Sequence, residues 1–421
     1  MNLRLWHSLA FRLLTGWLII SILPAILMWS DEILSWQFLQ TQINSFIASS
    51  VGILLSIWTL TKFTRFPGQR SMLMVLPTLL GVAVLLASVF LVFRVPYSVY
   101  YLTASLGVGL VFCFISQMVL RATSVPSIGY VPIGRCLALT EIENVHWVAL
   151  SPNHPLSCRE LSCQAVVADL ADSALSVQWE RLLAQATLDG IPVYNVLQVQ
   201  ESLTGRLPIK HLYENNLGSL LPSQAYLLFK RLLDTLVILF SLPITLPIAA
   251  LTATVIQWES RHTGGSILFV QERIGQGGKP FKMYKFRSMI TTSEADGAKM
   301  ATIDDVRITP FGRFIRKMRI DELPQFVNVI KGEMSLIGPR PEQRSFVVQF
   351  EQDIPFYSYR HIVKPGISGW AQVMHGYAGD EDETRVKLEH DFFYIKNFSL
   401  TLDLLIAIKT VQVMMTGFGA R

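Results

Sequence analysis

The stretch LLDTLVILFSLPITLPIAALTATVIQW, residues 232–258, decides how this chain is placed relative to a membrane. Apart from Asp234 and its hydroxyl residues the stretch is apolar, and it is longer than the ~20 residues that cross a bilayer as a helix. Pro243 and Pro247 lie in its middle, where each removes a helix hydrogen bond and bends the axis. The stretch therefore predicts either a kinked membrane span or a broken helix that enters and leaves by the same face.

The two interpretations differ in where they place the residues after Trp258. A span puts those residues outside the cell, whereas a hairpin keeps them on the cytoplasmic side. The flanking cations do not choose between the two, since Lys230 and Arg231 precede the stretch and Arg261 and Arg273 follow it.

The composition indicates a membrane protein with large parts outside the membrane. Of 421 residues, 51% are hydrophobic and only 16% are charged, against about 25% charged in soluble proteins. Early segments are each about long enough to cross a ~30 Å hydrocarbon core: 13–29, 43–60, 72–93 and 99–120. The first segment has no signal-peptide cleavage pattern, so we expect it to be a retained anchor.

The cations around these four segments predict their orientation. Arg4 and Arg12 precede the first segment, the first connection has no Lys or Arg, and the second connection has Lys62 and two arginines. By the positive-inside rule, both ends of a four-helix transmembrane block over 1–122 face the cytoplasm. The residues that follow are therefore expected to be cytoplasmic.

Residues 123–222 predict a small Rossmann-like α/β domain. VHWVAL, AVVADL and IPVYNV are strand-like runs, and 179–187 predicts a helix, an alternation typical of a parallel sheet. Gly129 and Gly134 do not form a G-x-G-x-x-G motif after a strand, so no dinucleotide site is expected. The cysteine spacing matches neither zinc nor redox motifs, which favours reduced thiols.

A second stretch, KMRIDELPQF at 317–326, carries the adjacent acids Asp321 and Glu322 just before Pro324. Acids before a proline often open a helix by capping its free N–H groups. Alternatively, one acid attacks a phosphoryl group, which requires nearby cations to neutralise the phosphate charge. The local sequence leaves both interpretations open.

Cations and polar residues that could surround a diphosphate lie on both sides of this acid pair. Lys285 and Arg287 share one face of a strand-like run, and Arg340 is held between two prolines that fix its backbone. The candidate substrate-binding residues are Gln271, Arg273, Lys285, Arg287, Arg316, Arg319 and Arg340. The net charge of +5 suits a protein that binds phosphates or anionic lipid, and nucleic acid would fit it equally.

Several long motifs resemble the bacterial sugar transferases, which are monotopic polyprenyl-phosphate phosphoglycosyl transferases. The motifs are KFRSM, DVRITPFGRFIRKMRIDELPQ, GEMSLIGPRPE, VKPGISGWAQV and DFFYIKNFSLTLDL, within 229–420. The preceding segments resemble the large members of the family, of the undecaprenyl-phosphate glucose or galactose phosphotransferase type. The resemblance implies a catalytic α/β domain at 223–421, anchored by a re-entrant helix at about 231–257. That helix is broken at a proline matching Pro247, with Pro243 helping.

The resemblance also implies a reaction. Asp321 attacks the sugar-bearing phosphate of a UDP-sugar, UMP leaves, and undecaprenyl phosphate takes the phosphosugar from the aspartate. Glu322 assists, and Mg²⁺ is required, with either acid able to hold it. Glucose or galactose is the first choice of sugar and an N-acetylated sugar the next. The product would begin exopolysaccharide or O-antigen synthesis.

These implications set the expected partners and location. The partners are a UDP-sugar, undecaprenyl phosphate, membrane lipid and a second copy of the chain as a homodimer, with no nucleic acid. Because UDP-sugars are cytosolic, the hairpin interpretation of 232–258 is favoured. The expected location is the bacterial inner membrane, with several membrane passes and the catalytic domain on the cytoplasmic face.

Two other functions remain possible on sequence grounds. One is a scaffold that recruits polysaccharide-assembly proteins, although the intact acid pair and its cations argue against it. The other is a polytopic transferase that joins both substrates in one step, although four spans and a hairpin are too few for that class. A protein-bound phosphosugar formed without lipid separates the double displacement from both.

Overall fold

The computed structural model describes most of the chain in two compact units, Met1–Thr204 and Gly205–Arg421. The described residues are 6, 8–35, 38–63, 74–123, 127–142, 145–151, 163–209, 221–259, 261, 265–290, 307–375 and 381–416. The predicted domain boundary near residue 222 stays a prediction, because residues 210–220 lie outside this described part.

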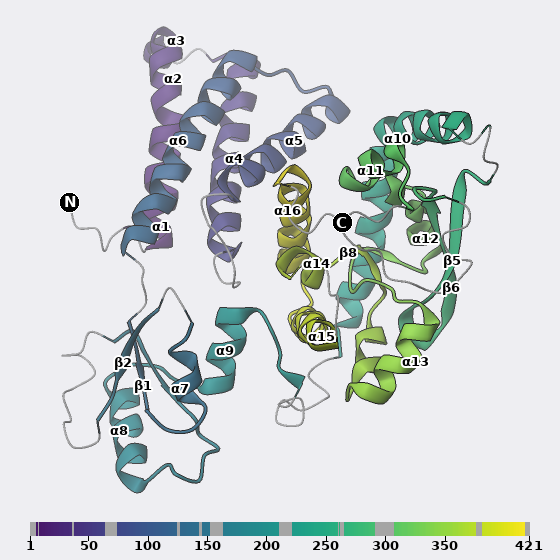
Figure 1. Cartoon of the computed structure of the whole chain (residues 1–421). Coiled ribbons are helices and arrows are strands. Elements are labelled where there is room, and N and C mark those ends of the chain that lie inside the picture. Colours follow the sequence, from purple (N-terminus) through teal and green to yellow (C-terminus); the bar gives the residue numbers. More distant parts are fainter. Residues whose placement is uncertain are drawn as a thin grey trace. The chain divides into compact units, whose positions relative to one another are not determined.

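The first unit begins with apolar helices that match the predicted transmembrane block (Figure 1). The helices are α1 (Leu9–Trp17), η2 (Leu18–Ile22), α2 (Leu23–Met28), α3 (Ser30–Ser35), α4 (Gln40–Phe63), α5 (Val75–Phe93) and α6 (Val99–Thr123). Four segments in this region are long and apolar enough to cross a membrane: Leu9–Met28, Gln40–Lys62, Val75–Phe93 and Val99–Leu120. Met72, the predicted start of the third segment, lies outside the described residues.

The rest of the first unit is a small parallel α/β fold, as predicted. Its strands are β1 (Ser127–Tyr130), β2 (His146–Ala149), β3 (Ala165–Ala168) and β4 (Val193–Asn195), in the order β2-β1-β3-β4 and all parallel. Its helices are α7 (Cys136–Leu139), α8 (Val177–Leu188) and α9 (Val196–Thr204). Val166 packs on the α8 side and Val167 on the α7 and α9 side, so β3 is buried on both faces.

The second unit has short strands surrounded by helices. β5 (Leu268–Ile274) and β6 (Pro280–Phe286) form an antiparallel hairpin across η6 (Gln276–Gly278), and β7 (Ser335–Ile337) pairs in parallel with β8 (Gly366–Ser368). The helices after β6 are α11 (Pro310–Lys317), η7 (Ile320–Glu322), α12 (Gln325–Lys331), α13 (Arg344–Asp353), η8 (Tyr357–Ile362), α14 (Trp370–Met374), α15 (Glu381–Lys396) and α16 (Leu400–Thr416). The predicted α/β character of the C-terminal part is confirmed.

The apolar stretch 232–258 lies in α10 (Gln224–Glu259), which bends sharply (Figure 1). Ile238 packs in one core cluster with Met283, and Ile256 packs in another with Phe286. In a straight helix Ile238 and Ile256 would lie ~27 Å apart, whereas Met283 and Phe286 are three residues apart on β6, at most ~10 Å.

Both limbs of α10 therefore pack on the same strand, and the helix must turn between them. Pro243 and Pro247 lie inside the turn region and supply the cause, since each interrupts the helix hydrogen bonds. The side chains between the limbs are apolar and exposed, with Phe240 74% and Ile244 69% accessible. An apolar bend that projects from a folded unit fits contact with lipid.

Polar contacts hold the first turns of α10 to other elements of the second unit. Lys230 Nζ lies 2.6 Å from a carboxylate oxygen of Asp403 on α16. One turn later Asp234 accepts a hydrogen bond of 2.6 Å from the Ser335 hydroxyl at the start of β7. These contacts connect the membrane-type helix to the strand that leads into the predicted site.

Candidate active site

The acid pair lies on η7, a single helical turn reached through a strained residue. Arg319, between α11 and η7, has φ 53° and ψ 22°, a left-handed conformation that costs a non-glycine residue on the order of 1–3 kcal/mol. This left-handed residue changes the direction of the chain between α11 and η7. The acid pair that follows is buried, with Asp321 only 8% exposed and Glu322 only 6%. Strain of this kind gathers at functional sites, where the surrounding structure holds it in place.

Helix capping does not explain the two acids. The helix that follows, α12, begins at Gln325, and its N-cap residue is Pro324, with no side-chain capping bond. Neither acid is recorded as a hydrogen-bond partner of an α12 N–H group among the described residues. Burial of two carboxylates therefore needs another reason.

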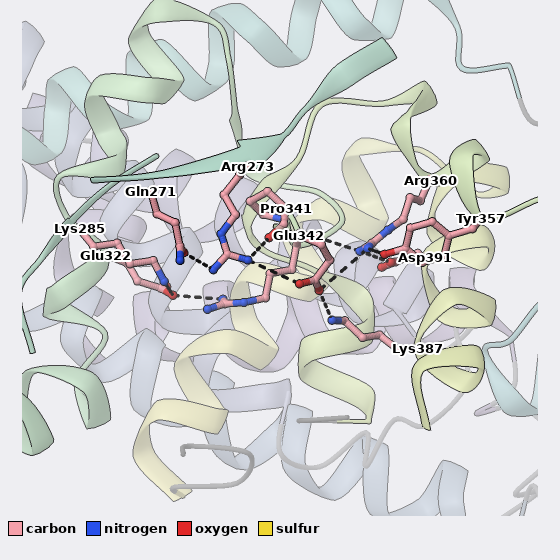
Figure 2. A network of polar contacts seen from close by, with 11 residues as sticks. Gln271, Arg273, Lys285, Glu322, Pro341, Glu342, Tyr357, Arg360, Lys387 and Asp391 are labelled. Carbon is pink, nitrogen blue, oxygen red and sulfur yellow. Dashed lines mark hydrogen bonds and ion pairs between the residues drawn. The ribbon is translucent and has the colours of Figure 1, made fainter. Parts of the chain in front are cut away.

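Glu322 is held by cations from three separate segments. Its carboxylate lies 3.2 Å from Arg340 Nη1, 3.3 Å from Arg319 Nη1 and 3.6 Å from Lys285 Nζ. Lys285 is on β6, Arg319 precedes η7, and Arg340 lies in the loop after β7. Figure 2 shows Lys285 beside Glu322. The fold thus brings three of the seven predicted substrate-binding residues to one carboxylate.

Asp321 differs from its neighbour, because no ion pair to it is recorded among the described residues. Burial raises the pKa of Asp321, and the adjacent charge of Glu322 raises it further. Lys285, Arg316 and Arg340 lower this pKa, but together they do not offset the increase. Arg316, for which no contact with Asp321 is recorded in the described part of the chain, lowers the Asp321 pKa through its positive charge.

The pKa of Glu322 moves the opposite way. Burial alone raises it, but the charges of Lys285, Arg340 and Arg319 outweigh burial and hold the pKa below its usual value. Burial and the charge of Arg340 lower the pKa of Lys285 to about 8. Two adjacent acids whose pKa values are pushed apart are suited to different chemical roles.

Around the acid pair, the residues that the structure describes carry more positive than negative charge. Lys285, Arg319 and Arg340 contact Glu322, and Arg316 acts on Asp321, so four cations face two carboxylates. Clustered cations in a partly buried site are unfavourable when they lack matching anions. A phosphate or diphosphate would supply the missing negative charge and accept charged hydrogen bonds from the arginines.

In the part of the chain that the structure describes, no contact of Gln271, Arg273 or Arg287 with the acid pair is recorded. Arg273, on β5, donates to Gln271 Oε1 at 2.6 Å and to the Pro341 carbonyl at 3.3 Å, and lies 3.6 Å from Glu342. Arg287 follows the end of β6, and the recorded contacts of the acid pair do not include it. Gln271 thus contacts Arg273, and Arg273 contacts the loop that carries Arg340.

Sequence reasoning missed a second polar cluster centred on Glu342 (Figure 2). Glu342 pairs with Lys387 at 2.5 Å, and it lies 3.6 Å from Arg273 and 4.0 Å from Arg360. Arg360 is 4% exposed and donates to Asp391 at 2.8 Å. The one available signal was position, since Glu342 closes the GPRPE motif directly after the arginine held between prolines.

Known proteins resemble this chain over nearly its whole length. A family model described as bacterial sugar transferase matches residues 225–417. A protein of Aeromonas hydrophila, named UDP-N-acetylgalactosamine-undecaprenyl-phosphate N-acetylgalactosaminephosphotransferase, is 46% identical over 400 residues, which cover 95% of this chain and 93% of that protein. The chain belongs to the bacterial sugar transferase family. It is an enzyme of the polyprenyl-phosphate phosphoglycosyl transferase class.

Other relatives match smaller parts of this sugar transferase. A UDP-glucose:undecaprenyl-phosphate glucose-1-phosphate transferase of Klebsiella pneumoniae is 35% identical over 255 residues, 60% of this chain and 51% of that protein. A putative undecaprenyl-phosphate N-acetylgalactosaminyl 1-phosphate transferase of Bacillus subtilis is 48% identical over 135 residues, 32% of this chain and 74% of that protein. Membership of this family favours an enzyme over a scaffold.

The sugar transferase offers few ligands for the expected Mg²⁺. Among the described residues no group of three or more His, Cys, Asp and Glu side chains could hold a metal. Asp321 and Glu322 supply two carboxylates side by side, and Mg²⁺ is usually held by one or two carboxylates together with substrate phosphates. The acid pair therefore fits Mg²⁺ in the presence of a diphosphate substrate and does not form a closed protein cage.

Proposed function

We propose that the enzyme transfers N-acetylgalactosamine 1-phosphate from its UDP-sugar to undecaprenyl phosphate and releases UMP. The choice of sugar is supported by the Aeromonas relative, which matches nearly the whole chain and carries that donor in its name. The glucose relative from Klebsiella matches 60% of the chain. This reverses the order of sugars expected from the sequence, where glucose or galactose came first.

The proposed mechanism is supported above all by the difference between the two acids in ion pairs and in pKa. Glu322 is engaged by three cations, which lower its pKa and balance its negative charge, so it is the poorer nucleophile of the two acids. Asp321 has a raised pKa and no ion pair with any other described residue, so its carboxylate is the more basic and more available of the two. We assign Asp321 as the nucleophile and Glu322 as the anchor that keeps the cations at the phosphate site.

In the first half-reaction an Asp321 oxygen attacks the phosphorus that bears the sugar. A new O–P bond forms, the bond from that phosphorus to the UMP oxygen breaks, and UMP leaves with the electron pair. Arg340, Arg319 and Lys285 face the same region and would stabilise the negative charge that moves to the leaving phosphate. Mg²⁺ held by the acid pair and the diphosphate would add further neutralisation.

In the second half-reaction a phosphate oxygen of undecaprenyl phosphate attacks the same phosphorus. The bond between Asp321 and phosphorus breaks, which restores the carboxylate and yields undecaprenyl-diphosphate sugar. This lipid product would serve as the starting unit for exopolysaccharide or O-antigen assembly. The same cations can serve both steps, because the leaving and entering groups are both phosphates.

We also propose that α10 is re-entrant and that the second unit lies on the cytoplasmic face of the inner membrane. Both limbs of α10 pack on β6, which supports entry and exit on one side. UDP-sugars are cytosolic, so this arrangement brings the soluble donor and the phosphate of the lipid to the same surface. The four apolar helices of the first unit would cross the membrane fully.

Cysteine labelling tests the re-entrant arrangement. Gln224→Cys and Arg261→Cys place probes just at and beyond the two ends of α10, in a background without the native cysteines. Both probes should react with an impermeant maleimide in inside-out vesicles. Leu34→Cys, in the predicted external connection, should react only in spheroplasts. Reaction of Arg261→Cys from the spheroplast side alone would show that α10 crosses the membrane.

A donor panel tests the proposed function itself. Solubilised enzyme, undecaprenyl phosphate and Mg²⁺ are incubated with UDP-N-acetylgalactosamine, UDP-N-acetylglucosamine, UDP-glucose or UDP-galactose, and UMP release is followed. We expect kcat/KM to be highest for UDP-N-acetylgalactosamine by at least about tenfold, the discrimination that one specific substrate contact provides. Preference for UDP-glucose would overturn the sugar assignment, and no UMP from any donor would overturn the transfer reaction.

A further inference from the structure

Arg340 lies in a loop whose backbone is held mainly through carbonyl oxygens. Pro339 and Pro341 flank it and have no N–H to donate. The carbonyls of four consecutive residues each accept a hydrogen bond: Pro339 from Gly366 N at 2.9 Å, Arg340 from Arg360 Nη2 at 2.9 Å, Pro341 from Arg273 Nη1 at 3.3 Å and Glu342 from Ile274 N at 3.0 Å. Two of these four donors are arginine side chains.

The carboxylate of Glu342 lies close to both of those arginines. Glu342 Oε2 is 3.6 Å from Arg273 Nη1, and its Oε1 is 4.0 Å from Arg360 Nη1. Lys387, from α15, pairs with the same carboxylate at 2.5 Å. Glu342 thus lies close to both arginines that hold the loop to which Glu342 itself belongs (Figure 2).

Arg360 is fixed on its other sides as well. It is 4% exposed, and it donates to the Tyr357 hydroxyl at 2.6 Å and to Asp391 at 2.8 Å. A guanidinium can satisfy several acceptors at once because its donors form a rigid planar fork. A lysine at this position would keep the charge but could not reproduce these contacts together with the one to the Arg340 carbonyl.

We propose, on the basis of the function proposed above, that Glu342, Arg360 and Arg273 are positioning residues that aim the Arg340 guanidinium at the substrate phosphates. Arg340 is the only member of this group recorded in contact with the described acid pair, at 3.2 Å from Glu322. The other three act through the loop backbone. The sequence predicted that Arg273 binds the substrate. The proposal assigns it instead to holding the loop that carries Arg340.

A double-mutant cycle tests this assignment. Arg360→Lys is expected to lower kcat/KM for the UDP-sugar by about tenfold, the size of one charged hydrogen bond. In an Arg340→Ala background the same substitution is expected to cost less than about twofold, because its effect passes through a guanidinium that is no longer present. Arg273→Lys provides an independent second arm with the same expected pattern.

The control is Arg344→Lys, an exposed arginine at the start of α13, which should leave kcat/KM unchanged in both backgrounds. Thermal unfolding is measured for every variant, so that a general loss of stability is recognised. Equal losses from Arg360→Lys and Arg273→Lys with and without Arg340 would overturn the positioning role. That result would leave the transfer reaction intact, since the reaction is judged on wild-type UMP release alone.

Discussion

Asp321→Asn should abolish the protein-bound phosphosugar that the wild type forms from radiolabelled UDP-N-acetylgalactosamine in the absence of lipid. The amide cannot attack phosphorus, whereas Glu322 is engaged by three cations and has a lowered pKa. Turnover with undecaprenyl phosphate should fall by at least about 10³-fold, as for loss of other covalent nucleophiles. The measurement is acid-stable label on the protein together with UMP release.

Stability measurements show whether this variant is inactive for chemical reasons. Burial raises the folded-state pKa of Asp321 above its unfolded value, so ionisation of this group at higher pH costs folding stability. Asp321→Asn cannot ionise, and it should therefore unfold at a higher temperature than the wild type at pH 8. The difference should shrink as the pH falls below the Asp321 pKa.

Two outcomes would contradict the assignment of Asp321. Label that remains on Asp321→Asn would place the nucleophile elsewhere. Wild-type enzyme that releases UMP with lipid but never carries label would favour a one-step transfer, in which the lipid phosphate attacks the UDP-sugar directly. A variant that is inactive and also unfolds early would instead show that Asp321 is needed for the fold.

Removal of divalent ions is expected to have the second large effect. EDTA should reduce both the protein-bound label and UMP release to background, and excess MgCl₂ should restore them. The acid pair supplies only two carboxylates, so the metal should be held tightly only when a diphosphate contributes oxygens. Attack by an anionic carboxylate on an anionic diphosphate is strongly disfavoured without added positive charge.

Thermal unfolding gives a readout of the metal that is separate from turnover. MgCl₂ alone should change the unfolding temperature little, whereas MgCl₂ with UDP should raise it more than UDP with EDTA. The matched control is Asp321→Asn, which should lose part of this extra stabilisation because one carboxylate is missing. Full turnover in EDTA would exclude the metal from the reaction.

Features that depend on local sequence were predictable. The apolar helices of the first unit follow from segments about as long as a bilayer is thick, and their observed bounds differ from the predicted ones by a few residues. The β2, β3 and β4 strands were found from their apolar runs. β1 was missed, because SIGY at 127–130 is short and contains a glycine.

Features that depend on distant partners were not predictable. The sequence predicted that Lys285, Arg319 and Arg340 lie near the acid pair. It could not show that all three form ion pairs with Glu322 and none with Asp321. Arg360 pairs with Asp391, 31 residues away. No local pattern marks such a pair, since only the packing of η8 against α15 brings the two together.

The bend in α10 is an intermediate case. Pro243 and Pro247 showed where the helix could break, yet a kinked span has the same prolines. The packing of Ile238 and Ile256 in clusters with residues of β6 supports the re-entrant arrangement that we propose, and it is a relation between residues far apart in the chain. The sequence thus located the break, and tertiary packing sets its direction.

The polar base of α10 has a consequence for enzymes that work in bilayers of different thickness. Moving a charged side chain into hydrocarbon costs several kcal/mol, and Lys230 and Asp234 are bound to Asp403 and Ser335 of the folded unit. On the re-entrant arrangement, these residues act as a stop that prevents the helix from sinking further. A thicker or thinner membrane would then change the tilt of the apolar limbs, while the Asp321 carboxylate keeps its height above the lipid headgroups.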